Sequence, residues 1–188
     1  YHPIPLKYLA SYLISDAALP RKSVVITFDD GYLNNYEIVF PILKTLCIPA
    51  TIFLTTDFID LRKPLWPDRV EYVLNNISYN EIDLSFLEKS VPLFLKTIED
   101  RKYADTIIRK HLKHMTESNK EIALNEIEEK AGIALNKQSL DSSLYSPLMW
   151  EQVREMAESG LIEFGSHTAT HPILTYCTPA QITYELTE

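Results

Sequence analysis

Three short runs of apolar and β-branched residues most constrain what this chain can fold into. They span residues 24–28, 50–54 and 161–165, and segments with helical spacing at 34–46 and 151–159 separate them. The first run has the continuous apolarity of a strand that is covered on both faces. Strands that alternate with helices pair in parallel, because each helix carries the chain back across the sheet. The sequence therefore predicts an α/β fold with parallel strands.

The helical segment 34–46 contains a proline. Its apolar residues Ile38, Ile42 and Leu46 recur at helical spacing and mark one face of the predicted helix. Pro41 has no amide hydrogen, so it should kink this helix or split it into two pieces.

The stretch from about residue 60 to residue 143 differs from the segments around it. It is richer in charge, contains a single glycine, Gly132, and repeats apolar residues at helical spacing. We expect a helical insert between two strands of the core, within one domain that covers the 188 residues of the chain. His111 and His114 lie in this insert, where a solvated helix face is the expected environment.

Charge and composition exclude several classes of partner. The formal net charge is −8 at pH 7, and a field of that sign repels phosphate backbones, so nucleic acid is not expected as a partner. No apolar run approaches the roughly 20 residues that a membrane span needs, and no targeting segment is recognisable at the start. Cys47 and Cys177 match no metal-binding spacing, and their apolar neighbours favour buried free thiols over a disulfide.

Signatures of other catalytic classes are missing from the sequence. It contains no GxSxG elbow and no HExxH motif. It also lacks the glycine-rich loops that cradle phosphates, and the whole chain has only four glycines. The chemistry must therefore be sought in other polar clusters.

Polar side chains follow the first and the third apolar run, at the points where these strands should end. Asp29 and Asp30 follow the first run, and His167 and His171 follow the third. The loops beyond the carboxyl ends of parallel strands gather on one side of a sheet, so both pairs can face one pocket. Paired aspartates before a glycine are also common in plain turns, and an HxxxH pair alone is a weak signal. Their shared position at strand ends is what favours a common site.

The residue types and their spacing favour a metal site. His167 and His171 are four residues apart, which on a helical turn brings both imidazoles to one face. Two imidazoles and one carboxylate would give an ion three protein ligands and leave positions open for water and substrate. Adjacent residues at a strand end point in different directions. One of Asp29 and Asp30 can therefore bind the ion while the other stands beside it as a base.

Two segments carry a family resemblance. Residues 27–32, Thr-Phe-Asp-Asp-Gly-Tyr, and residues 167–172, His-Thr-Ala-Thr-His-Pro, resemble the first two motifs of the polysaccharide deacetylases of carbohydrate esterase family four. The flanking residues agree with that family as well, so that the resemblance covers roughly residues 20–58 and 146–188.

The resemblance implies a distorted (β/α) barrel, of which this chain would form the N-terminal part, and it implies roles for individual residues. Asp30, His167 and His171 would bind one divalent metal ion, with zinc expected first and cobalt or nickel as options. Asp29 would be the general base that takes a proton from the attacking water, and the Thr168 hydroxyl would brace the histidine loop. The reaction would release acetate from an N-acetylated polysaccharide, at the cell envelope or outside the cell.

The sequence departs from the family in one respect. The later family motifs supply an arginine beside the base and a histidine that protonates the leaving amine, and they have no counterpart after His171. Two alternatives stay open: a related amidase that acts on a small non-peptide amide, and a fragment that binds glycan or metal without catalysis. Trp66 and Tyr72 of the insert could stack on a sugar, although packing within the insert is the expectation for both. The polymer, the substrate-binding residues and the oligomeric state stay open as well.

Overall fold

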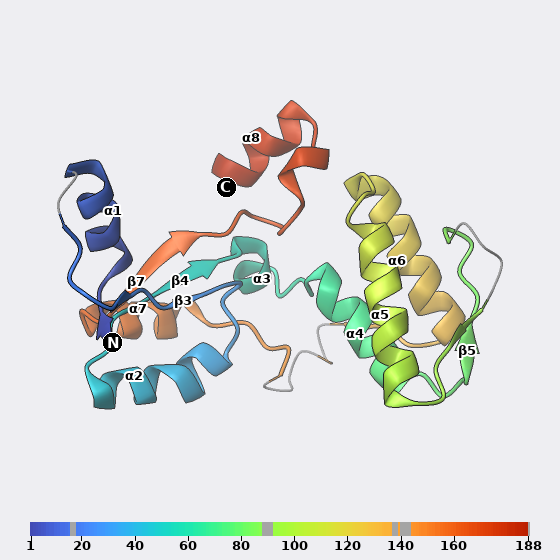
Figure 1. Ribbon diagram of the computed structural model, residues 1–188. Helices are drawn as coiled ribbons and strands as arrows, with labels where there is room; N and C mark the ends of the chain where they lie inside the picture. Colours follow the sequence, from blue (N-terminus) through green and yellow to red (C-terminus); the bar gives the residue numbers. More distant parts are fainter. Residues whose placement is uncertain (16–17, 88–91, 137–138, 140–143, 188) are drawn as a thin grey trace. The chain divides into compact units, whose positions relative to one another are not determined.

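The fold is described by a computed structural model, which Figure 1 shows as a ribbon. The structure describes residues 1–15, 18–87, 92–136, 139 and 144–187.

The chain divides into two compact units. The first takes its residues from 1–63 and 140–171, and the second from 64–139 and 172–187. The predicted insert at about 60–143 largely coincides with residues 64–139, the larger piece of the second unit. Its predicted end at residue 143 lies outside the described residues. That residues 1–188 form one catalytic domain stays a prediction.

A parallel sheet lies at the centre of the first unit. It contains β3 (Thr27–Phe28), β4 (Ala50–Leu54) and β7 (Ile162–Ser166), in the order β3-β4-β7. Both neighbouring pairs are parallel. The predicted α/β fold with parallel strands is therefore confirmed. In the described part of the chain these strands form an open sheet, as a partial barrel requires.

The first apolar run is divided between two partners. Its start forms β2 (Ser23–Val24), which pairs with β1 (His2–Pro3), and its end forms β3, which pairs with β4. No residue from 23 to 28 is buried, so the prediction of a strand covered on both faces is wrong here. The chain changes neighbours within the run, which leaves each half short and at an edge.

Two helices pack against the central sheet through one apolar cluster. They are α2 (Phe40–Leu46) and α7 (Trp150–Glu158), and Figure 1 shows both beside the strands. The cluster joins side chains of the two helices to side chains of β4 and β7, including Phe40, Leu43, Val153, Met156, Ile52, Leu54 and Ile162. By contrast, α1 (Leu6–Ser15) contains no buried residue.

A π-helical turn explains why the predicted helix face at 34–46 is wrong. The turn η1 (Asn35–Val39) precedes α2, so the segment is split near Pro41 as predicted. However, Ile38, Ile42 and Leu46 are all more than half exposed. A π turn contains more residues than an α turn, so it shifts the side chains that follow relative to a uniform helical spacing.

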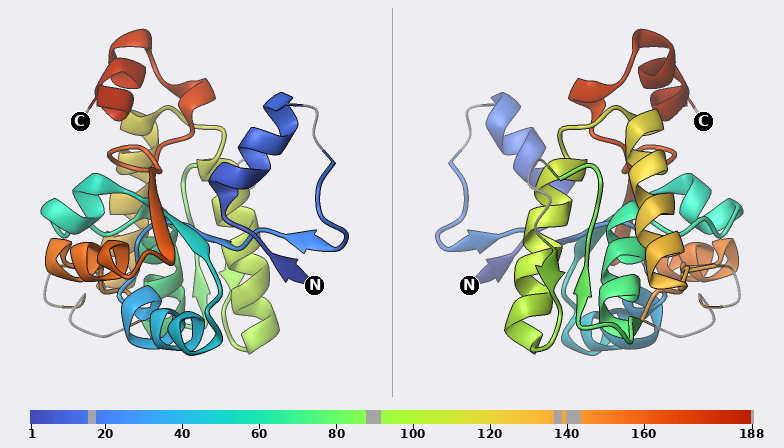
Figure 2. Two further views of the ribbon diagram at one scale, coloured as in Figure 1. Left: turned by 90° about the vertical axis from the view of Figure 1, so that its left-hand side faces the viewer. Right: turned by 90° about the vertical axis from the view of Figure 1, so that its right-hand side faces the viewer.

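The second unit has its own apolar core between three helices. These are α4 (Trp66–Asn76), α5 (Ile98–Leu112) and α6 (Glu117–Ala131), and Figure 2 shows them side by side. The buried side chains of this core include Val70, Val73, Ile108, Leu112, Leu124 and Ile127.

The predicted insert is not wholly helical. An antiparallel pair of short strands, β5 (Glu81–Ile82) and β6 (Leu93–Phe94), lies between α4 and α5 in the sequence. The second unit also includes the short 3-10 helix η3 (Leu174–Tyr176) and α8 (Pro179–Thr187).

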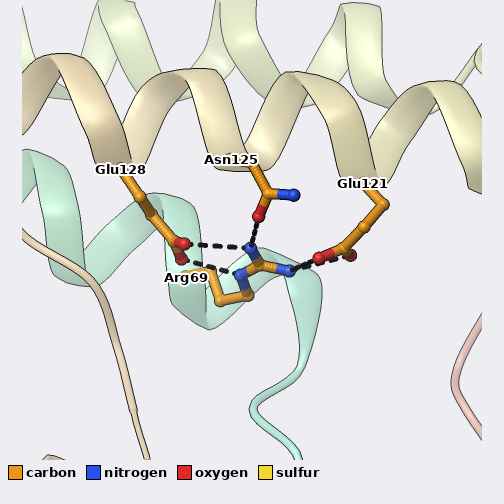
Figure 3. Close-up of polar contacts among 4 residues, drawn as sticks. All are labelled: Arg69, Glu121, Asn125 and Glu128. Atoms are coloured by element: carbon orange, nitrogen blue, oxygen red, sulfur yellow. Dashed lines mark hydrogen bonds and ion pairs between the residues drawn. The ribbon is translucent and has the colours of Figure 1, made fainter.

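Arg69 joins two of the helices of the second unit. Figure 3 shows this side chain of α4 among Glu121, Asn125 and Glu128 of α6. Its guanidinium donates to both carboxylate oxygens of Glu128, at 2.7 and 3.0 Å, and also to Glu121 at 2.9 Å and Asn125 at 3.0 Å. The side chains of Arg69 and Glu128 are only 12% and 15% exposed, so the two bonds between them lie largely out of water and fix one helix on the other, whereas Glu121 is 52% exposed.

Both cysteines are free, as predicted, but their predicted burial is wrong. Cys47 is exposed and Cys177 is half-buried. Cys47 lies just beyond the C-terminal end of α2, in a left-handed conformation with φ of 52° that ends the helix before the chain enters β4. Within the described residues, no helix combines the length and the apolarity needed to cross a membrane.

Candidate metal centre

The three side chains that were predicted from sequence to bind a metal, Asp30, His167 and His171, meet in the first unit. The Asp30 Oδ1 atom lies 3.4 Å from His167 Nε2 and 3.5 Å from His171 Nε2. One donor atom from each residue lies within 4.8 Å of the other two. Asp30 follows β3 and His167 follows β7, and these strands pair with opposite edges of β4. The carboxyl ends of parallel strands thus bring the two motifs together.

The donor atoms fit a divalent cation in spacing and in kind. Ligand bonds of about 2.0–2.1 Å in a tetrahedral site place neighbouring donors about 3.3–3.4 Å apart. The observed separations of 3.4 and 3.5 Å are close to that value. Asp30 Oδ1 is also buried and accepts no hydrogen bond from the described residues, which is costly unless a cation completes its environment. Two imidazoles and a carboxylate suit a divalent transition-metal ion.

The electrostatics of Asp30 point the same way. Burial raises the pKa of its carboxyl group above the ordinary value, while His171 and His167 lower this pKa and Asp29 raises it. Desolvation and the neighbouring carboxylate therefore both oppose the negative charge. A divalent cation among these groups would offset that cost, because it would be the largest local charge.

The histidine loop is not the helical turn that the HxxxH spacing predicted. The strand β7 ends at Ser166, and residues 167–173 form no helix. Thr168 and His171 adopt left-handed conformations, with φ of 69° and 63°. The Thr168 Oγ1 atom accepts a hydrogen bond from the His171 N–H at 3.1 Å. This loop brings the imidazole rings of His167 and His171 to a centroid separation of 4.9 Å without a helix.

The two adjacent aspartates have different surroundings. Asp30 is half-buried and faces the imidazoles, whereas Asp29 is exposed. The chain turns at Asp30 and Gly31, which have left-handed conformations with φ of 73° and 89°. The Gly31 N–H donates to the Asp29 carbonyl at 2.9 Å and closes this turn. The Asp30 carboxylate thus lies beside the two imidazoles, whereas Asp29 is open to solvent.

Sequence reasoning missed the segment that follows β4. Here the short helix α3 (Thr56–Asp60) begins, and Thr55 precedes it. The N–H groups of Thr55, Thr56 and Asp57 donate to carbonyls of the aspartate turn and the histidine loop. A Thr-Thr-Asp sequence directly after a core strand was the available signal.

The aromatic and histidine residues of the insert lie in the second unit. Trp66 packs against its core, with the Lys120 ammonium 5.2 Å from the ring centroid. Tyr72 is half-buried. His111 Nδ1 lies 2.8 Å from the Ile107 carbonyl oxygen, and His114 Nδ1 lies 2.7 Å from the hydroxyl of Tyr176. Among the described residues, only Asp30, His167 and His171 form a group that could hold a metal ion.

Comparison with known proteins identifies relatives of the chain. A family model described as polysaccharide deacetylase matches residues 16–188. A Bacillus subtilis protein that carries the name polysaccharide deacetylase YxkH is 33% identical over 89 residues, which are 47% of this chain and 32% of that protein. The poly-β-1,6-N-acetyl-D-glucosamine N-deacetylase of Escherichia coli is 42% identical over 50 residues, 27% of this chain and 7% of that protein. The chain thus spans a third or less of these relatives.

A solved structure shares the fold. It is the Streptococcus pyogenes deacetylase PplD in complex with acetate, with a TM-score of 0.51 and 17% sequence identity. The likeness covers 99% of this chain and 46% of that one. Because the family model matches nearly the whole sequence and includes both motifs of the candidate centre, this chain belongs to the polysaccharide deacetylase family.

Proposed function

We propose that this protein is a metal-dependent hydrolase that removes N-acetyl groups from a polysaccharide or an amino-sugar oligomer. The observation that carries the proposal is the meeting of Asp30, His167 and His171, whose donor atoms lie within 4.8 Å of one another. Membership of the polysaccharide deacetylase family supports the same reaction. The three residues would hold one divalent cation, for which zinc is the first candidate and cobalt or nickel the next.

The proposed roles follow from the surroundings of each residue. When bound, the cation would acidify water and polarise the acetamide carbonyl. Asp29 would take the proton of the attacking water, because it is an exposed carboxylate next to a ligand. Thr168 would keep His171 in place through its hydroxyl oxygen. Water adds to the carbonyl carbon, the carbon–nitrogen bond breaks, and acetate and a free amine are released.

The substrate class is proposed from the family and from a relative. The Escherichia coli relative is named for a polymer of N-acetyl-D-glucosamine. An N-acetylated glycan is therefore the first substrate to test, and the cell envelope or the secreted fraction is the proposed place of action.

An acetate-release assay tests this function. The chain is stripped with a chelator, reloaded with zinc, cobalt or nickel, and incubated with oligomers of N-acetylglucosamine. We expect acetate and free amines in equal amounts from the loaded protein only. Asp29→Asn should keep the metal and lose the activity, and His111→Ala should behave as the wild type. Full activity in the stripped protein or in Asp30→Asn would overturn the proposal.

A further inference from the structure

We infer that Thr55 is a positioning residue that ties the two halves of the metal centre together; this inference rests on the proposed function. Its N–H donates to the carbonyl of Asp30 at 3.2 Å, and its Oγ1 donates to the carbonyl of His167 at 3.3 Å. One residue that is not itself a ligand therefore binds the backbone of a ligand from each motif.

The Thr55 hydroxyl forgoes its usual local partner to make this contact. Thr55 is the N-cap of α3, a position where threonine normally accepts a hydrogen bond from an N–H of its own helix. No such bond is present here. The side chain is fully buried, at 0% exposure, so its hydroxyl depends on the His167 carbonyl as a partner.

The backbone around Thr55 repeats the same connection. The Thr56 N–H donates to the Thr168 carbonyl at 3.3 Å, and the Asp57 N–H donates to the Ala169 carbonyl at 2.9 Å. The His167 N–H in turn donates to the carbonyl of Leu54, the residue before Thr55, at 2.8 Å. The first N–H groups of a helix have no partners within it. Here they hold the histidine loop instead.

The loops need such support because their conformations are unfavourable on their own. Asp30, Thr168 and His171 are all non-glycine residues with φ between 63° and 73°. Residues in this region persist where the surrounding structure holds them. The segment that begins at Thr55 contacts both loops, and its loss should therefore loosen the spacing of the ligands.

Metal affinity, measured by competition with a chelator, tests this role. Thr55→Ser and Thr55→Ala both remove the methyl group, but only the serine variant keeps the hydroxyl. Thr55→Val removes the hydroxyl at nearly constant side-chain shape. The matched control is Thr51→Val. Thr51 is also buried on β4, but its hydroxyl has no hydrogen-bond partner among the described residues. Thermal unfolding of each metal-free variant is measured alongside.

We expect zinc affinity to fall about 10-fold in Thr55→Val and Thr55→Ala, which is the scale of losses when groups behind metal ligands are removed. Thr55→Ser and Thr51→Val should stay near the wild type. Equal losses of zinc affinity in Thr55→Ser and Thr55→Ala would overturn the inference, because packing would then explain them. Wild-type zinc affinity in Thr55→Val would overturn it as well. If the valine variant does not fold, the serine–alanine comparison decides. Asp30→Asn separates the two proposals: if it also binds zinc normally, the metal centre itself is wrong.

Discussion

Gly31 faces the side chain of Leu54 so closely that a Cβ atom on the glycine would lie 2.9 Å from Leu54 Cδ2. The glycine also has φ of +89°, a backbone conformation that residues with a side chain rarely adopt. The turn that presents Asp30 is therefore built against the end of β4, next to the segment that holds the histidine loop.

Gly31→Ala should both destabilise the protein and weaken metal binding. We expect a loss of about 2–4 kcal/mol in the free energy of unfolding, from the left-handed backbone and the contact with Leu54 together. Gly132→Ala is the matched control, because Gly132 has φ of +66° and nothing within 4 Å of an added Cβ. It should cost about 1–2 kcal/mol, from the backbone alone. Denaturant titration and zinc affinity check both variants. Equal effects of the two would show that the Leu54 contact is unimportant.

Arg69→Ala should destabilise the protein by about 2–3 kcal/mol, because Glu128 keeps its charge in a site that is only 15% exposed. Arg154→Ala serves as the control, since its pair with Glu151 is exposed on both sides. That variant should change stability by less than about 0.5 kcal/mol. Chemical unfolding measures the difference in the free energy of unfolding. A small effect of Arg69→Ala would mean that the ion pair between Arg69 and Glu128 contributes no more to stability than a surface pair.

Thr56→Pro should remove one backbone donor without disturbing its helix. Thr56 is the first residue of α3, a position that favours proline, and Thr55 has the extended conformation that must precede one, with φ of −92° and ψ of 109°. The variant loses the bond from Thr56 N–H to the Thr168 carbonyl. We expect zinc affinity to fall several-fold, up to about 10-fold, at nearly unchanged thermal stability of the metal-free chain.

The control for this variant is Ile98→Pro, at the first position of α5 in the second unit, which contributes no ligand to the candidate centre. A drop in zinc affinity with Ile98→Pro as large as that with Thr56→Pro would contradict a specific role for the bond to the histidine loop.

The meeting of the two motifs was predictable from sequence because each directly follows a short core strand. Residues 50–54 form β4 as expected, and 161–165 differ from β7 by one residue at each end. Parallel strands place the loops after their carboxyl ends on one edge, so Asp30 and His167 had to lie near each other. Helical spacing likewise identified α2 and α7.

The features that sequence missed depend on contacts between remote segments. The division of the first run requires His2 and Pro3 as a separate partner for β2. The role of Thr55 requires carbonyls from two other loops, which no local pattern encodes. At 34–46 the error is local: a π turn has no strong sequence signature, and it changes which side chains face the core.

X-ray absorption spectroscopy of the zinc-loaded chain tests the central claim most directly. The account predicts one zinc per chain with two imidazole nitrogens at about 2.0–2.1 Å and oxygen ligands completing the shell. His171→Ala should remove one imidazole, and His114→Ala should leave the spectrum unchanged. A shell with sulfur at about 2.3 Å, or one that keeps both imidazoles after His171→Ala, would contradict a centre formed by Asp30, His167 and His171.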